Sequence, residues 1–526
     1  MKTDSFADLK EVINALKPEE IEVAKKFIVA FDSNITKNQS KSLKLFKVLV
    51  EHPNIDKDGA RKMTSKNVNE RSFDKLVLRL KDKVLESLTL DINTNRKGSY
   101  SELYKTVFDV RKKIMQAHII FGRGMNKTAF KLYDKIIVKA KKYELYDELL
   151  EVLTYKQLDF GLRFGKKEFD KYSKEIAFYE QCKNSAYMAR NWYYRHFIEE
   201  IDFTGVNSKN LEMLNHAIAE LEEKYRLTQS ANVGFYLYFL MMEHFLVQGD
   251  YEACVNTGHQ LISLIENSPA VYTPMRLGNA YTDLADNELF LRHFDSAIKH
   301  AQVASEHFLP NSYNYEVAVE TEFRAHFYNN DFDHSMAVIS RLLEQSKPTR
   351  SPFQYSKRMY FKACVMFLMG EFKQSYQLLQ STREMEKDKE GWNIGIRILS
   401  ILNHIELMLL DVADVEIESL RKHIERVRED RAVRPRERKI LRILIQLEKN
   451  SFDFPRVKEK CQDDLDLLAS DQKDYCWELK THEMIAFHIW FQCKVDNTNY
   501  RLEFPDRLLD SGTVGGLTQS AFGQTS

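Results

Sequence analysis

Side chains that could do chemistry are plentiful in this 526-residue sequence, but their spacing matches no catalytic motif. No Walker-type loop, with Lys-Ser or Lys-Thr directly after its last glycine, is present, and neither Gly-x-Ser-x-Gly nor His-Glu-x-x-His occurs. Phe121-Gly122-Arg123-Gly124 contains a Gly-x-Gly, but no strand pattern precedes it and no third glycine follows, so a turn between helices is the better interpretation. We therefore expect no catalytic residue and no enzymatic activity.

One group of potential metal ligands lies near the C-terminus. His482, His488 and Cys493 occur close to Cys476 and Glu483, and these ligand types suit zinc. However, two histidines six residues apart lie on opposite sides of a helix, and the residues between them are mostly apolar. We interpret the group as core and expect neither a metal nor another cofactor.

Two basic segments could bind an anionic partner. Arg71, Lys75, Arg79 and Lys83 recur every fourth residue on a predicted helix whose apolar stripe runs from Phe73 to Leu88. With a short predicted helix at 56–64 before it, this arrangement is like a helix-turn-helix or winged-helix unit that binds DNA. Acidic residues interrupt the basic stripe, so a solvated helix face is the competing interpretation.

The second basic segment, residues 421–439, holds nine Lys or Arg and four acidic residues. Part of it fits ion pairs on one helix surface, because acidic and basic residues occur four apart. Its end, RAVRPRERK, is less balanced and could hold an acidic partner; the alternative is an exposed turn between helices.

Composition indicates long helices. The chain has only 18 Gly and 10 Pro, where average usage is about 7% and 5% of residues, so turns are few. Because 44% of the residues are hydrophobic and 77 basic residues balance 77 acidic ones, a folded core is expected and a disordered chain is not. The zero net charge gives no general reason to bind nucleic acid or membranes.

A repeat becomes visible from about residue 230. Four short turns each carry one aromatic residue, with a small side chain three positions later. The turns read GDYEAC, RHFDSA, NDFDHS and GEFKQS, with Tyr251, Phe294, Phe332 and Phe372 as the aromatics. A helical hairpin cannot bury its apolar face alone, so such units stack. We expect the four aromatic rings to be almost wholly buried between the two helices of each hairpin.

This pattern resembles the tetratricopeptide repeat family, in which the second helix begins with an aromatic and has a small residue three places later. The resemblance covers about 230–390, with a period near 40 rather than 34 residues and without the usual Trp and Leu-Gly pair of the first helix. It implies an all-α fold, a right-handed solenoid of helical hairpins behind a small N-terminal helical domain. It also implies a concave surface, lined by the first helices, that binds a protein or peptide.

On this basis we expect a scaffold or adaptor without catalytic activity. Its binding residues would lie on the predicted first helices, at positions outside the hairpin seam: Asn279, Asp283, Asn287, Arg324 and Arg358. The alternative is a transcriptional regulator whose N-terminal domain binds DNA and whose repeats sense a partner. Nucleic acid would then bind only through residues 1–95.

The predicted organisation has five parts. A helical domain covers 1–95, degenerate helical repeats cover 96–230, tetratricopeptide-like repeats cover 231–395, C-terminal helical repeats or a cap cover 396–500, and a flexible tail covers 501–526. The first residues show no apolar run behind a basic start, and no run of about 18 apolar residues occurs, so we expect a cytoplasmic protein that does not enter a membrane. Self-association is left open.

Overall fold

The computed structural model describes residues 4–30, 40–65, 69–90, 101–202, 208–345, 351–382, 385, 388, 391–427 and 433–504. Throughout these residues the regular structure is α-helical and no strand occurs, which confirms the predicted all-α class. The chain forms two compact units, Met1–Lys139 and Ala140–Ser526, which are treated separately below. The finer five-part division remains a prediction, and the expected tail beyond residue 504 lies outside the described residues.

The first unit begins with a small helical block. Its helices, together with the hairpin that follows, are α1 (Ser5–Asn14), α2 (Pro18–Ala30), α3 (Lys41–Glu51), α4 (Lys57–Thr64), α5 (Glu70–Leu90), α6 (Glu102–Gly122) and α7 (Asn126–Lys142), whose last residues enter the second unit. Helix α5 packs against α1, α2 and α3 through a buried stripe that includes Phe73, Val77, Leu80 and Val84, as the periodicity predicts. The described residues of this block contain no strand that could form a wing, and the helix-turn-helix interpretation remains a prediction.

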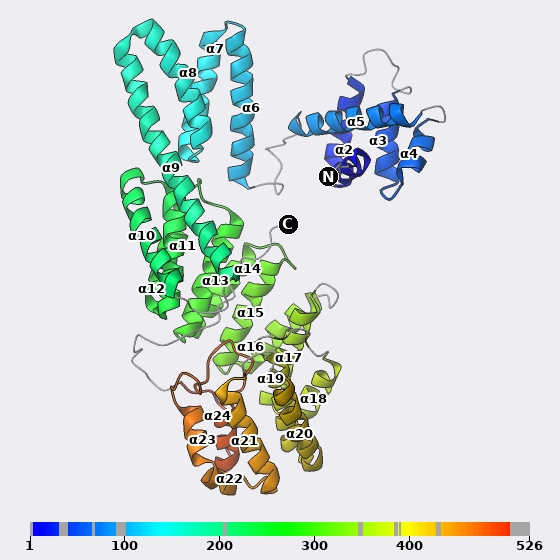
Figure 1. Ribbon diagram of the computed structural model, residues 1–526, viewed down its shortest axis with the longest axis vertical. Coiled ribbons are helices and arrows are strands. Elements are labelled where there is room, and N and C mark those ends of the chain that lie inside the picture. The colour runs from blue at the N-terminus through cyan, green and yellow to red at the C-terminus, as the bar shows by residue number, and fades with distance from the viewer. Residues whose placement is uncertain are drawn as a thin grey trace. The chain divides into compact units, whose positions relative to one another are not determined.

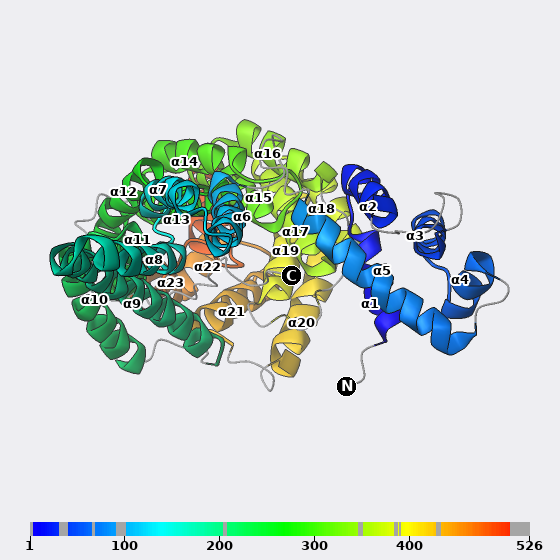
Figure 2. The ribbon, with the colours of Figure 1, turned by 90° about the horizontal axis from the view of Figure 1, so that it is seen from above.

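The second unit is a row of helices that pack in chain order (Figure 1). They are α8 (Tyr146–Phe164), α9 (Lys166–Asp202), α10 (Ser208–Thr228), α11 (Ala231–Gln248), α12 (Tyr251–Asn267), α13 (Pro274–Phe290), α14 (Phe294–Glu306), α15 (Tyr313–Tyr328), α16 (Phe332–Gln345), α17 (Pro352–Leu368), α18 (Phe372–Ser381), α19 (Trp392–Glu406), α20 (Leu410–Val427), α21 (Pro435–Lys449), α22 (Phe454–Lys460), α23 (Gln462–Ala469) and α24 (Phe487–Asp496). In Figure 2 the first helices α11, α13 and α15 lie on the inner side of the row, and the second helices α12, α14 and α16 on the outer side.

One turn geometry joins the two helices of seven described hairpins. The residue two positions before the second helix has a positive φ. The next residue donates its N–H to the carbonyl five residues earlier, so a carbonyl group in the last turn of the first helix has a hydrogen-bond partner. The positive-φ residues are Gly124, Glu144, Gly249, Arg292, Asn330, Gly370 and Met408. Because four of the seven are not glycine, the sequence marks this turn only intermittently.

The predicted repeat register is correct. Tyr251, Phe294, Phe332 and Phe372 are the first residues of α12, α14, α16 and α18. The small residue three positions later is fully buried in all four hairpins, and the same holds for Ala129 of α7 and Ala413 of α20. At two of these positions the helices approach so closely that the side chain donates to a main-chain carbonyl of the first helix: Ser375 to Ala363 at 2.8 Å, and Cys254 to Met242 at 3.4 Å.

The expected burial of the aromatic rings is only partly correct. Phe294 is buried, but Tyr251, Phe332 and Phe372 are half-buried. The three half-buried residues each begin a helix at the end of a hairpin, where solvent is close. The Phe372 ring contacts Phe367 of its own hairpin (5.2 Å between centroids), and the Tyr251 ring stacks on Phe290 of the next one (4.8 Å). The small residue, rather than the aromatic one, lies at the centre of the seam.

We predict that Ser375→Leu destabilises the second unit by about 1–3 kcal/mol, because the larger side chain cannot fit where α18 meets the main chain of α17. Urea unfolding followed by circular dichroism measures the change. Gln374→Leu, at the exposed neighbouring position of α18, is the matched control and should change stability by less than about 0.5 kcal/mol. Equal effects of the two substitutions would show that the helices do not approach closely at Ser375.

Candidate binding surface

The five residues predicted to line the concave surface do lie on first helices. Asn279, Asp283 and Asn287 are on α13, Arg324 is on α15 and Arg358 is on α17. Their exposure differs from the expectation, because Asn287, Arg324 and Arg358 are buried and the other two are half-buried. No contact with a partner tests their role in binding, which remains a prediction.

The residues of α13 are engaged within the chain. Asn279 accepts a hydrogen bond from the Asn314 amide of α15 at 3.2 Å, and the Asn287 amide donates to the Asp283 carbonyl at 2.8 Å. Burial raises the pKa of Asp283 well above its ordinary value, and the neighbouring carboxylate of Glu243 raises it further. This stretch of α13 therefore contributes polar contacts between helices.

Arg324 and Arg358 belong to an ion-pair network that joins α15 to α17. The Glu320 carboxylate lies 3.1 Å from Arg324, 2.9 Å from Lys357 and 3.9 Å from Arg358, while Arg358 also pairs with Glu316 at 3.1 Å. Burial alone would raise the pKa of Glu320, but the three cations outweigh it and lower the pKa to about 2. The two arginines are thus cross-links between neighbouring hairpins.

Part of the inner face holds the chain's own C-terminal segment, residues 475–504. The Lys480 N–H donates to the Tyr328 hydroxyl (3.0 Å), and the Tyr360 hydroxyl donates to the His482 carbonyl (2.7 Å). Asn330 pairs with both main-chain groups of Leu502, accepting from its N–H at 2.8 Å and donating to its carbonyl at 2.9 Å. The segment is held mainly through its backbone by side chains from successive hairpins.

Three further contacts fix this segment. The Lys480 ammonium pairs with Asp286 of α13 at 2.8 Å, and the Trp490 indole donates to Glu406 of α19 at 2.9 Å. At Gly395 of α19 an added Cβ would overlap the His482 carbonyl oxygen, so the segment lies directly against the α19 backbone. His482, Met484, Phe487 and Phe491 are buried. The segment is therefore part of the core.

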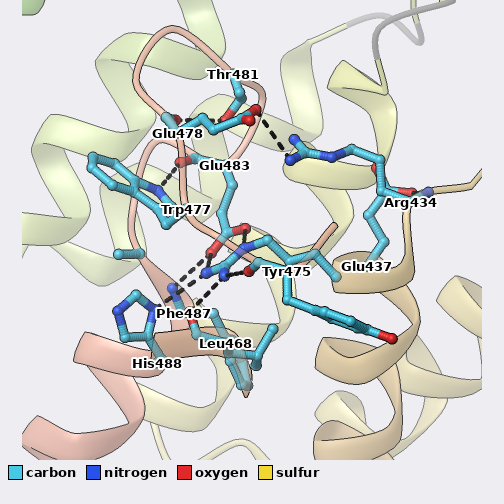
Figure 3. A network of polar contacts seen from close by, with 12 residues as sticks. Arg434, Glu437, Leu468, Tyr475, Trp477, Glu478, Thr481, Glu483, Phe487 and His488 are labelled. Carbon is cyan, nitrogen blue, oxygen red and sulfur yellow. Dashed lines mark hydrogen bonds and ion pairs between the residues drawn. The ribbon is translucent and has the colours of Figure 1, made fainter. Parts of the chain in front are cut away.

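A buried ion pair connects the segment to α21 (Figure 3). The Arg436 guanidinium meets both carboxylate oxygens of Glu483, at 2.6 and 2.8 Å, and also donates to the carbonyls of Leu468 and Tyr475. Burial would raise the pKa of Glu483, but the Arg436 charge and the hydrogen bonds from Arg436 and the Phe487 N–H lower it below its ordinary value. The geometry is the bidentate one in which a buried pair is best compensated for its lost hydration.

In its described part, the basic segment 421–439 combines exposed cations such as Lys422 and Arg438 with cations that are paired within the chain. Arg421 pairs with Glu418 and Glu425 on its own helix at 2.7 and 2.6 Å, as the four-residue spacing predicts. In the RAVRPRERK stretch, Arg434 pairs with Glu478 at 3.1 Å, and Arg436 is fully buried. Two cations of this stretch therefore pair with carboxylates of the chain's own C-terminal segment, and binding of an external acidic partner remains a prediction.

Of the histidine and cysteine group near the C-terminus, His482 is buried as interpreted from the sequence, whereas His488, Cys476 and Cys493 are half-buried. His482 is buried and its ring lies 3.0 Å from Glu437. Burial and the nearby Arg436 charge lower the pKa of His488 to about 4, so its ring is neutral near pH 7. The Cys493 thiol lies 3.6 Å from the Asn499 carbonyl. Each side chain is thus held by different partners.

The basic stripe of α5 has mixed surroundings. Arg71, Lys75 and Arg79 are exposed, whereas Lys83 is half-buried. Asp74, between the first two, forms an ion pair with Lys57 of α4 at 2.8 Å. This pattern fits a solvated helix face at least as well as a DNA-binding face.

A group of aromatic and cationic side chains lies on α9, α11 and α13, and its exposed members are on α9. We define it as the Tyr–Arg patch: Tyr187, Arg190 and Tyr194 of α9, Tyr236 of α11 and Arg276 of α13. The side chains of Tyr187 and Tyr194 are 63% and 56% exposed, a large apolar area to leave in water. They lie on one face of α9 because they are seven residues apart. The Arg190 guanidinium lies over the Tyr187 ring at 5.6 Å.

The exposed residues of α9 adjoin the buried Tyr236 of α11. The ring of Tyr193, next to Tyr194, packs 5.1 Å from that of Tyr236. Burial raises the pKa of Tyr236, and the positive charges of Arg276 and Arg190 oppose that rise, which places both guanidinium groups near its hydroxyl. Tyrosine and arginine are the side chains that most often dominate binding energy at protein interfaces.

The sequence showed the density of aromatics in this region but not their role. Tyr187, Tyr193, Tyr194 and Phe197 are close in sequence, yet Tyr193 and Phe197 pack inward and the other two point outward. The signal that could have found the patch is the spacing Tyr187, Arg190, Tyr194, which follows one helix face.

No family model matches the sequence, and a comparison with curated proteins found no match. Among solved structures, the chain is similar to a signal transduction ATPase with numerous domains (STAND) protein with a tetratricopeptide repeat sensor from Pyrococcus horikoshii. The identity is 12% and the TM-score 0.36, over 81% of this chain and 68% of that chain. This likeness is too weak to carry an argument about function.

The hairpins themselves define the fold. The shared turn, the buried small residue and the aromatic at the start of the second helix make the second unit a divergent tetratricopeptide-like array. No helix in the described ranges has both the length and the apolar character that crossing a membrane requires.

We predict that Glu320→Gln reduces the acid sensitivity of the fold. Because the pKa of Glu320 falls from 4.5 to about 2 on folding, its charge contributes stability above pH 4.5, and that contribution is lost as the pH falls toward 2. Urea unfolding at a series of pH values should show a smaller loss between pH 5 and 2 in the variant, which at pH 7 should be less stable by on the order of 3 kcal/mol. Glu306→Gln, on the exposed surface of α14, should keep the wild-type pH profile.

A second prediction concerns the buried ion pair of Arg436 with Glu483, which is part of the network in Figure 3. Arg436→Met should destabilise the second unit by about 3–5 kcal/mol, because it leaves the Glu483 carboxylate buried without its cation. The double variant Arg436→Met/Glu483→Gln should recover part of that loss in thermal or urea unfolding. Arg442→Met, whose side chain is 65% exposed, should cost less than about 1 kcal/mol. Failure of the double variant to recover stability would contradict the assigned coupling.

Proposed function

We propose that this chain is a non-catalytic adaptor or scaffold that binds an extended segment of a partner protein on its first helices. One observation carries the proposal: Tyr328, Tyr360 and Asn330 already hold main-chain groups of non-helical residues of the chain, Lys480 and His482 before α24 and Leu502 after it. Hydrogen bonds to backbone groups do not depend on the side chains of the bound segment, so an array of hairpins that holds one non-helical segment is suited to hold another.

The bound segment also limits where a partner can lie. Residues 475–504 contact α13, α15, α17 and α19 and are part of the core, so the surface beneath them is not open to a partner. The Tyr–Arg patch on α9, α11 and α13 supports a binding surface outside that region, because Tyr187 and Tyr194 are exposed there.

The chemistry of the patch favours an acidic segment. Arg190 and Arg276 can form charge-assisted hydrogen bonds with carboxylates, while the tyrosine rings offer flat apolar area and hydroxyl groups for the backbone. We therefore propose that the partner contributes an extended, acidic stretch that crosses α9 and α11. On the inner face, Glu320 and Glu483 are ionised and paired with cations of the chain. The proposal assigns them no role in catalysis and includes no chemical step.

The test uses the full-length protein and a display library of unstructured 15-residue peptides. We expect enrichment of peptides rich in Asp and Glu. Tyr187→Ala/Tyr194→Ala should weaken binding of these peptides at least tenfold, as loss of about 1.4 kcal/mol requires, with an unchanged melting temperature. Arg190→Glu should weaken binding further, because it places a carboxylate against the acidic peptide.

Leu162→Ala is the matched control, because this side chain of α8 is 88% exposed and lies outside the patch. It should leave peptide binding unchanged. Enrichment of basic peptides, or equal binding by the wild type and the patch variants, would overturn the proposed surface. Binding of random duplex DNA that is lost in Arg71→Glu/Lys75→Glu would instead favour the regulator predicted as the alternative.

A further inference from the structure

The turn between α15 and α16 brings together two histidines and one aspartate. His326 lies in the last turn of α15, Asp331 is the residue before α16, and His334 lies in its first turn. The Nδ1 atoms of both histidines are 2.9 Å from the Asp331 carboxylate. The two rings stack nearly parallel, at 15° with 5.2 Å between centroids. Among the described residues this is a compact set of three potential ligands on one turn.

The backbone of this turn is well fixed. Asn330 has a φ of 59°, and the Asp331 N–H donates to the His326 carbonyl at 3.0 Å, which links the backbones of two of the ligands. The Asn330 side chain also holds both main-chain groups of Leu502. The His326 side chain is only 11% exposed, so its ring has little room to turn away, while that of His334 is 71% exposed and can adjust.

We propose that His326, Asp331 and His334 form a binding site for a divalent transition metal of the zinc class. One ligand atom from each residue lies within 4.8 Å of the others. Metal–nitrogen bonds of about 2.0–2.1 Å place neighbouring ligand atoms of a tetrahedral site about 3.3 Å apart, and the two nitrogen–oxygen separations here are 2.9 Å. Imidazole nitrogen and carboxylate oxygen are ligands that such metals accept.

Metal binding would replace the hydrogens that now lie between the imidazoles and the carboxylate. A neutral imidazole with its proton on Nδ1 would carry it on Nε2 instead, and an imidazolium would release one proton. Three protein ligands leave a fourth position for water. The bound metal would tie the end of α15 to the start of α16, so it should raise the stability of the hairpin that holds Leu502.

A turn of the same geometry, in the preceding hairpin of the array, provides a matched control. In the α13–α14 turn, His293 occupies the position equivalent to Asp331, one residue before the second helix. Its Nδ1 lies 2.6 Å from Glu288. This turn has one imidazole and one carboxylate in contact, and a two-ligand site of this kind binds zinc much more weakly than a three-ligand site.

The test uses full-length protein that has been treated with a chelator and dialysed. Titration with zinc chloride in a calorimeter should show one site per chain, with a melting temperature that rises with zinc concentration. Cobalt(II), added in place of zinc, should give the visible absorption of a tetrahedral site. His334→Ala and Asp331→Asn should each weaken zinc binding at least tenfold and abolish the cobalt spectrum.

The choice of variants separates metal binding from folding. Asp331 accepts from the His334 N–H at 3.3 Å at the start of α16, and asparagine caps a helix as well as aspartate, so Asp331→Asn should keep the metal-free melting temperature. His293→Ala should leave zinc affinity and the cobalt spectrum unchanged. The proposal is overturned if the wild type shows no zinc-dependent stabilisation, or if His334→Ala and Asp331→Asn bind zinc as the wild type does.

Discussion

The close approach of two helices at one small residue is the constraint on which the second unit depends. Cys254, Ala297, Ser335 and Ser375 are each fully buried one turn into the second helix. A larger side chain there would separate the helices and expose the apolar faces that neighbouring hairpins share. Since each hairpin packs on the next, a change in this spacing would be passed along the row.

The stacking of hairpins also explains the buried ion pairs between α15 and α17. Once hairpins are stacked, polar positions on successive first helices face one another at close range, where water is excluded. Glu320 then lies among Arg324, Lys357 and Arg358, and its low pKa reflects three cations rather than solvent. Positions that would be solvated on a single helix are thus converted into contacts between helices, which is why they are poor candidates for a site that a partner can reach.

The return of residues 475–504 to the inner face has the largest consequence for function. Asn330 and Leu502 are joined by two hydrogen bonds although 172 positions separate them in the chain. Hydrogen bonds with Tyr328 and Tyr360 and the ion pair with Arg436 hold the same segment. The array therefore shows how it can hold the main chain of a non-helical segment. The same segment occupies the surface where a ligand of such an array would be sought.

The sequence by itself determined the all-α class, the hairpin register at Tyr251, Phe294, Phe332 and Phe372, and the burial of His482, because these follow from local periodicity, spacing and neighbours. Only the tertiary structure decided that Arg324, Arg358 and Arg436 are buried in ion pairs and that three of the repeat aromatics are half-buried. It alone brought His326 and His334 to one carboxylate and turned Tyr187 and Tyr194 outward. The physical reason is that burial and charge pairing depend on which distant segment packs against a helix face, and helical periodicity contains no information about that partner.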